Sequence, residues 1–357
     1  MARSVLGLDI GSHSIKVMEL KEGKGGSWKL LKFGLHKLPA EAIVDGAIMN
    51  SAAVVEGIRD LVARHKIKTR DVAASIAGHS VIIKKITLPA MSEDELSESI
   101  QWEAEQYIPF SINDVNIDTQ VLSRNDESGQ MDVLLVAAKK EIIQEYSAVV
   151  AEAGLKPLVM DVDGFTLENA FDLRGDAESG ETVALVNIGA SLININILSN
   201  GITAFNRDIN MGGNQFTEEI QKQLNVSYEE AEALKLGGNI SSTQSTTEAI
   251  VPQEVGSILR STSEAVAVEI QRSIDFYLAT ASGTTLNRLV LSGGTAKVSG
   301  LKDALESTLN TKVEMSDPFR NITFNPKEFD PDYLSDLAPM AVVVTGLAMR
   351  RLGDKPA

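Results

Sequence analysis

The sequence predicts an α/β protein of two domains that carries a small inserted α+β module. A chain of 357 residues is too long for one ordinary core, so two domains are expected. Residues 6–12 and 185–191 each predict an apolar strand that ends in a glycine turn and leads into a second strand. Residues ~85 to ~160 predict a helix, a hairpin and a helix with apolar faces of their own.

Composition places the chain among soluble globular proteins, since 43% of its residues are hydrophobic and 23% are charged. The chain contains no cysteine, which excludes disulfides and thiolate metal sites and suits a reducing compartment. Its four histidines are scattered without an H-E-x-x-H pairing, so we expect no catalytic zinc site.

The net charge of −16 argues against general binding to nucleic acids or anionic membranes, because both need clustered lysine and arginine. Nucleotide binding stays open, since local backbone N–H groups and one or two cations hold phosphates. The N-terminus reaches Asp9 before an apolar run forms, and residues 340–349 are only about half a membrane span. We therefore expect a cytoplasmic protein that does not insert directly into a membrane.

The N-terminal part predicts strands over residues 4–8, 15–20, 28–35, 72–77 and 81–88. A helix is expected to begin at Asn50 and Ser51, because apolar residues then recur on one helical face. These residues are Val54, Val55, Ile58, Leu61 and Val62.

Within the module, Ser92 and Glu95 have the spacing of a capping box. The helix that they begin is expected to run to Pro109 and to carry Leu96, Ile100, Ala104, Tyr107 and Ile108 on one face. Residues 116–123 and 131–138 predict a hairpin, and residues 140–153 predict a helix that Gly154 ends.

The second half predicts strands over residues 182–187, 192–198 and 288–291. Helices are expected from Gly212 and Gly213 onward and over residues 228–236, 265–278 and 336–349, while residues 240–248 predict a loop.

Three glycine-containing strand ends carry the chemistry. Glycine in the turns at residues 9–12 and 187–191 lets backbone N–H groups approach a phosphate, although a single such turn is more often a plain hairpin. A third apolar strand runs into Ser292-Gly293-Gly294-Thr295, where flat backbone can lie against a nucleoside. The three strand ends in this order indicate a nucleotide site much more specifically than any one of them.

This set resembles the superfamily of actin, heat-shock-protein-70 and the sugar kinases, in which two related α/β domains close on ATP. The resemblance implies that Asp9 holds Mg²⁺ through water and that the first turn and Lys16 contact the phosphates. It also implies a second phosphate loop from Asn187, an adenosine loop from Gly293, and connecting helices over residues 163–171 and 338–348. The implied nucleotide contacts are Asp9, Gly11, Ser12, His13, Ser14, Lys16, Asn187, Gly189, Ala190, Ser191, Gly293, Gly294 and Thr295.

Gly212 and Gly213, with Glu232 and Lys235 downstream, resemble the segment of this superfamily that contacts ribose and base. Taken alone, Glu232 and Lys235 are better explained as a solvated helix face with a weak i,i+3 ion pair.

The module lies where the cell-division protein FtsA carries its extra subdomain, and residues 88–89, 101–110 and 187–191 resemble the PilM family of type IV pilus assembly proteins. That resemblance implies an ATP-binding adaptor at the cytoplasmic face of the inner membrane, which grips the N-terminal tail of a PilN-like membrane protein in a groove beside the module. Strand residues 81–88 would meet this peptide, although ordinary packing between subdomains explains an apolar surface there equally well. Other pilus platform and motor proteins are further expected partners, and a homo-oligomer is left open.

The resemblance also implies four subdomains. They are 1A over residues 1–84, 161–180 and 336–357, the inserted 1C over residues 85–160, 2A over residues 181–210 and 286–335, and 2B over residues 211–285.

The second phosphate loop departs from its relatives, because Asn187 replaces an aspartate that helps to organise metal and water. Asn187 keeps the shape but lacks the charge. Asp163, with Asp161 beside it, is the candidate for orienting the water, and a helix N-cap is an equally good explanation of Asp163. We therefore expect ATP to be retained, with slow hydrolysis or none.

Two alternatives remain open. A small-molecule kinase of the same superfamily would need a catalytic base, for which only Asp161 and Asp163 are candidates. An FtsA-like membrane-associated filament would need an anchor, and the sequence after Leu352 is not expected to form one.

Overall fold

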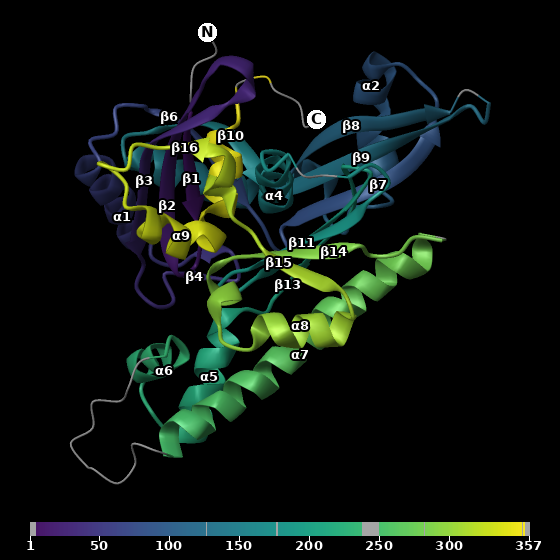
Figure 1. The fold of residues 1–357 in the computed structure, drawn as a ribbon. Helices are drawn as coiled ribbons and strands as arrows, with labels where there is room; N and C mark the ends of the chain where they lie inside the picture. Colours follow the sequence, from purple (N-terminus) through teal and green to yellow (C-terminus); the bar gives the residue numbers. More distant parts are fainter. Residues whose placement is uncertain are drawn as a thin grey trace.

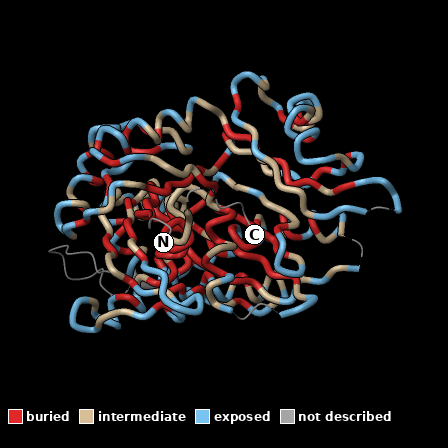
Figure 2. Tube along the Cα trace, turned by 90° about the horizontal axis from the view of Figure 1, so that it is seen from above, coloured by how far each residue is buried: buried red, intermediate tan, exposed pale blue. Residues whose placement is uncertain are grey.

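The computed structural model describes residues 5–125, 127–175, 178–237, 250–281, 283–351 and 353. It contains two large mixed sheets, one in each lobe of the molecule, and a smaller sheet that projects to one side (Figure 1). Buried residues gather in the middle of the molecule and exposed ones lie along its periphery (Figure 2). Among the helices of the described residues, none is both long and apolar enough to cross a membrane. The predicted loop over residues 240–248 lies outside the described residues.

The first sheet has six strands in the order β10-β6-β1-β2-β3-β16. Strands β1, β2 and β3 form an antiparallel meander, while β6, β10 and β16 join it in parallel. Its strands are β1 (Leu6–Ile10), β2 (Ser14–Glu22), β3 (Trp28–Lys37), β6 (Asp71–Ile76), β10 (Lys156–Val162) and β16 (Ile322–Thr323). A two-stranded hairpin of β4 (Ile43–Val44) and β5 (Ala47–Ile48) follows β3.

The second sheet repeats this plan with five strands in the order β13-β12-β11-β14-β15. Strands β11, β12 and β13 form the meander, and β14 and β15 extend it in parallel. Its strands are β11 (Thr182–Ile188), β12 (Ile193–Ser199), β13 (Ile202–Ile209), β14 (Arg288–Ser292) and β15 (Lys312–Met315). Strands β1 and β11 therefore hold equivalent places, and each ends beside a predicted glycine turn.

Helices cover both sheets and fill the space between them. The outer face of the first sheet packs on α1 (Ser51–Arg64) and α3 (Lys140–Glu152). The second sheet shares one core cluster with α5 (Gly213–Leu224), α7 (Ile250–Thr280) and α8 (Leu301–Leu309), and α6 (Tyr228–Lys235) joins this cluster by packing on α5 and α7. Helices α4 (Asp163–Asp172) and α10 (Val342–Ala348) lie in one core cluster together with residues of both sheets. They are the two connecting helices that the sequence predicts.

The smaller sheet has the order β7-β9-β8 and packs on α2 (Glu93–Ala104). Its strands are β7 (Val81–Pro89), β8 (Val115–Asn125) and β9 (Gln130–Lys139). Strand β10 pairs with β6, and α3 packs in the core of the first sheet. These pairings favour a module narrower than residues 85–160, and β16 likewise associates residues 322–323 with the first sheet. We propose that the module spans residues 81–139 and that residues 322–323 belong with the first sheet.

Two predicted helices end differently in the structure. Helix α2 ends at Ala104, whose carbonyl accepts hydrogen bonds from the N–H groups of both Tyr107 and Ile108 in the turn that follows. The single helix expected over residues 336–349 is wrong. The structure has α9 (Pro331–Leu337), a 3₁₀ turn (Ala338–Ala341) and then α10, because Pro339 has no N–H to continue the helical ladder. The capping box of Ser92 and Glu95 is confirmed.

Glycine allows α10 to pack closely on both neighbours. A Cβ at Gly346 would lie 2.1 Å from the carbonyl oxygen of Thr166 on α4, and one at Gly7 would lie 2.6 Å from that of Val344. We expect Gly346→Ala to lower the free energy of unfolding by about 1–3 kcal/mol or more, because neither helix can move without disturbing both sheets. Urea unfolding measures this change.

Gly256→Ala is the matched control, because Gly256 lies on α7 with no atom within 4 Å of the added Cβ. That change should raise the free energy of unfolding by about 0.5–1 kcal/mol. Equal effects of the two substitutions would contradict the close packing of α4 on α10.

Candidate functional site

A pocket of about 330 Å³ lies where the strand ends of the two large sheets meet. Seventeen of the predicted site residues line it: Asp9, Gly11, Ser12, His13, Ser14, Lys16, Asp163, Asn187, Gly189, Ala190, Ser191, Gly213, Glu232, Lys235, Gly293, Gly294 and Thr295. Gly212 is not among the lining residues and sits behind them, where a Cβ would lie 2.6 Å from the carbonyl oxygen of Ala190. Residues far apart in the sequence are thus brought together.

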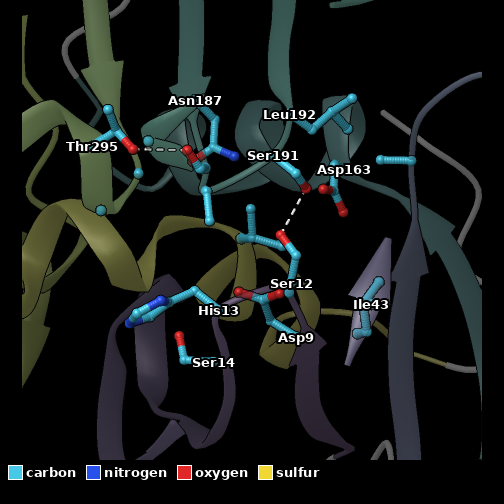
Figure 3. Close-up of a pocket in the computed structure, with 18 of the residues that line it drawn as sticks. Asp9, Ser12, His13, Ser14, Ile43, Asp163, Asn187, Ser191, Leu192 and Thr295 are labelled. Atoms are coloured by element: carbon cyan, nitrogen blue, oxygen red, sulfur yellow. Dashed lines mark hydrogen bonds between the residues drawn. The ribbon is translucent and has the colours of Figure 1, made fainter. Parts of the chain in front are cut away.

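The first and second glycine turns face each other across this pocket. The Gly11 N–H donates to the Ser14 carbonyl at 3.2 Å, and the Gly189 N–H donates to the Leu192 carbonyl at 2.8 Å, so both turns are closed by the same hydrogen bond. Ser12 Oγ and Ser191 Oγ lie 2.7 Å apart and form a hydrogen bond between the two domains (Figure 3). The two turns therefore form a matched pair.

A cation and a carboxylate stand beside the first turn. Asp9 and Lys16 are directly opposite each other on β1 and β2, and Lys16 Nζ donates to Asp9 Oδ2 at 3.0 Å. Each of these side chains is only 13% exposed, so both charges are held at the pocket wall with little freedom. Lys16 can therefore supply a positive charge to an anionic ligand in the pocket.

Glycine makes the third strand end fit closely against the second turn. Gly293 has a φ of +93°, and a Cβ there would lie 2.2 Å from the carbonyl oxygen of Ile188. The carbonyl of Gly189 accepts hydrogen bonds from Thr295 Oγ1 at 2.7 Å and from the Gly213 N–H at 2.9 Å. A Cβ at Gly294 would have only Met340 nearby, at 3.6 Å, so its backbone is open to the pocket.

Glu232 and Lys235 form a buried ion pair and not the solvated face that their spacing alone would predict. Lys235 Nζ also donates to Thr217 Oγ1 at 2.9 Å and to the carbonyl of Gly213 at 3.2 Å, and Thr217 donates to Glu232. Burial opposes the charge on Glu232, but the hydrogen bonds from Lys235 and Thr217 keep the pKa of this carboxyl below its ordinary value. A charged, fixed pair lines the wall beside the third strand end.

Asp163 is the first residue of α4, and the N-cap position belongs to Val162, so the N-cap explanation of Asp163 is wrong. Ser75 Oγ on β6 donates to Asp163 Oδ1 at 2.6 Å. Burial, together with the nearby charge of Asp9, raises the pKa of Asp163 to about 8. Asp163 therefore carries a proton at neutral pH in the ligand-free protein.

Asn187 begins a row of polar side chains whose other members belong to none of the sequence motifs. Its Nδ2 donates to Asn194 Oδ1 at 3.0 Å, and Asn194 Nδ2 donates to Asp208 Oδ1 at 2.8 Å. Asn194 is 1% exposed on an otherwise isoleucine-rich strand, and this polar residue among buried apolar ones is the signal that could have identified it. Ser75, the partner of Asp163, had no comparable signal.

Comparisons with known proteins agree with this architecture. The sequence model of the family described as type IV pilus assembly protein PilM matches residues 7–352. A solved structure described as a PilM–PilN type IV pilus biogenesis complex has a TM-score of 0.86 and 26% identity, covering 99% of this chain and 100% of that one.

More distant proteins share the fold. The cell division protein FtsA of Streptococcus pneumoniae is 21% identical over 385 aligned residues, which cover 96% of this chain and 81% of that protein. MreB5 of Spiroplasma citri bound to AMPPNP has a TM-score of 0.51 and 12% identity, covering 97% of this chain and 95% of that one. The predicted actin-like α/β fold is therefore confirmed, and the chain belongs to the PilM family of type IV pilus assembly proteins.

Proposed function

We propose that this chain is a cytoplasmic ATP-binding adaptor of the type IV pilus machinery, which binds the N-terminal tail of a PilN-like membrane protein. The observation that carries the nucleotide part is the matched pair of glycine turns from two domains, joined through Ser12 and Ser191. The likeness over nearly the whole chain to a structure described as a PilM–PilN complex supports the partner. Such a partner would hold the protein at the inner membrane.

The residues of the pocket fit Mg-ATP. Lys16 supplies positive charge beside the first turn, Asp9 offers a carboxylate for the hydration shell of Mg²⁺, and the open backbone at Gly294 leaves room for the nucleoside. ATP would supply negatively charged phosphates, which the backbone N–H groups of the two turns and Lys16 would hold. Glycine in both turns lets backbone N–H groups approach a phosphate closely, because no side chain stands between them.

Hydrolysis is proposed to be slow or absent. Asp163 is the carboxyl group best placed to accept a proton from water, but it is protonated at neutral pH in the ligand-free pocket. Asn187 brings no negative charge to the second turn. The pocket is thus better suited to retaining a nucleotide than to turning it over.

Mg-ATP should stabilise the folded protein through this pocket. At a concentration 100 times its dissociation constant, a ligand adds about 2.7 kcal/mol to the free energy of unfolding. Gly294→Val should abolish this gain, because its side chain would fill the open space in front of Met340 while the backbone tolerates a Cβ. Melting curves with and without Mg-ATP measure the effect.

Gly256→Val on α7 is the matched control for that substitution, since its side chain points into open space outside the pocket. This variant should keep the full stabilisation by Mg-ATP. A wild-type melting temperature that millimolar Mg-ATP leaves unchanged would remove the nucleotide proposal.

The raised pKa of Asp163 predicts a pH-dependent loss of stability. Because the folded-state pKa of about 8 lies above the ordinary 3.8, the free energy of unfolding should fall as the pH rises through this window. The Asp163→Asn variant should not show that loss, and at pH 8 its free energy of unfolding should be higher than that of the wild type by on the order of a few kcal/mol. Urea unfolding across the window tests this, with the exposed Asp303→Asn as control. Parallel pH profiles for wild type and Asp163→Asn would contradict the buried, protonated carboxyl.

The adaptor role predicts direct capture of a membrane-protein tail. A synthetic peptide with the N-terminal cytoplasmic sequence of the PilN-like protein, immobilised on beads, should retain the full-length chain, and a scrambled peptide should not. The same assay with and without Mg-ATP measures how the nucleotide affects binding of the partner peptide. No capture, combined with phosphate transfer from ATP to a small hydroxyl compound, would replace the adaptor by a kinase.

A further inference from the structure

A row of hydrogen bonds runs from the pocket to the link between the first sheet and the module. Asn187 lies directly opposite Asn194 in the sheet, and Asn194 lies directly opposite Asp208 on the next strand. The row is Asn187 Nδ2 to Asn194 Oδ1 at 3.0 Å, Asn194 Nδ2 to Asp208 Oδ1 at 2.8 Å, and the Gly78 N–H to Asp208 Oδ2 at 2.6 Å. Gly78 lies between β6 and β7, so the row crosses from one domain to the other.

The chemistry of the groups fixes the direction of every bond in this row. The backbone N–H of Gly78 can only donate, and the carboxylate of Asp208 in its ionised form can only accept, so with Asp208 ionised Asn194 turns its NH₂ group toward it, as the structure has it. Asn194 then presents its oxygen to Asn187, whose NH₂ group must face Asn194. The carbonyl oxygen of Asn187 is the atom that remains on its other side.

This oxygen of Asn187 keeps capacity for a ligand. Ser292 Oγ lies 3.4 Å from it and 3.3 Å from the carbonyl of Val186, and its single proton can serve only one of them. An amide oxygen has two lone pairs, so at least one stays available where Asn187 lines the pocket. Asn187 therefore offers an acceptor although it lacks a charge.

We propose that Asp208 is a positioning residue of the nucleotide pocket, which holds Asn194 and Asn187 so that Asn187 presents oxygen to the water shell of a nucleotide-bound divalent cation. The inference rests on the proposed nucleotide function. Asn187 supplies an oxygen, as a carboxylate would, while the carboxyl group itself stands two hydrogen bonds away at Asp208. The N–H of Gly78 and the amide of Asn194 both donate to Asp208 and favour its ionised form, although burial raises its pKa.

Asp208→Asn should reverse the row. The N–H of Gly78 still requires an acceptor, so the new amide turns its oxygen toward Gly78 and its NH₂ toward Asn194. Asn194 and Asn187 then flip in turn, and Asn187 presents NH₂ to the pocket. The gain in ATP affinity on adding Mg²⁺ should fall by about tenfold relative to the wild type, which is the size expected for one hydrogen bond to a charged group.

Asn187→Asp should rescue that variant although it harms the wild type. In the wild-type background the new carboxylate at position 187 and the carboxylate of Asp208 both require the NH₂ group of Asn194, so the melting temperature should fall. In the double variant Asn194 donates to the new carboxylate, all groups are satisfied again, and an oxygen faces the pocket. Both the melting temperature and the Mg²⁺-dependent gain should recover, so the two changes should be strongly non-additive.

The experiment measures ligand-free melting temperature, and ATP affinity with and without Mg²⁺, for the wild type, both single variants, the double variant and the exposed Asp303→Asn control. Alkaline buffer keeps Asp208 ionised. Additive melting temperatures, or an unchanged Mg²⁺-dependent gain in Asp208→Asn, would overturn the proposal. If the wild type binds no ATP, the proposed function fails, but the ligand-free melting temperatures still test the direction of the row. If Asp208→Asn does not fold, a double variant no more stable than Asn187→Asp overturns the proposal.

Discussion

The structure depends on close approaches between backbone segments within each domain, which only glycine permits. A Cβ at Gly346 would meet Thr166, and a Cβ at Gly293 would meet Ile188, so each contact exists only because glycine has no side chain. The second contact joins the ends of β11 and β14, and the first packs α10 on α4, two helices whose core cluster includes residues of both sheets. The hydrogen bond between Ser12 and Ser191 then joins two turns that would otherwise be separate loops. The pocket thus depends on close packing inside each domain as well as on this hydrogen bond between them.

The same packing sets the electrostatics of the pocket. Asp9 and Asp163 line the pocket, and Asp208 is linked to it through Asn194. Burial and the nearby charge of Asp9 raise the pKa of Asp163, and burial raises that of Asp208. Lys16 balances only Asp9 directly.

The sequence predicted the parts of this arrangement that depend on local chemistry. The glycine turns and the capping box of Ser92 follow from residue types at short spacing, while the connecting helix at Asp163 was implied by the resemblance to the superfamily, and the structure contains all of them. The partners of those residues come from strand register and could not be predicted. Asn194 meets Asn187 only because β12 pairs with β11 in one register, and Ser75 reaches Asp163 only because β6 lies beside β10. Pro339 broke a helix whose apolar pattern looked continuous.

The replacement of aspartate by Asn187 looks different once its neighbours are considered. Taken alone, it removes a charge from the second turn. With Asn194 and Asp208 behind it, the charge is moved away from the phosphates by two amide groups while an oxygen remains at the pocket wall. In the proposed Mg-ATP complex, a weaker field at the metal would favour retention of the nucleotide over attack by water, since phosphoryl transfer depends mainly on positioned charge. The row also ends at Gly78, in the link between β6 and β7, so the hydrogen bonds of the pocket wall reach the point where the module leaves the first sheet.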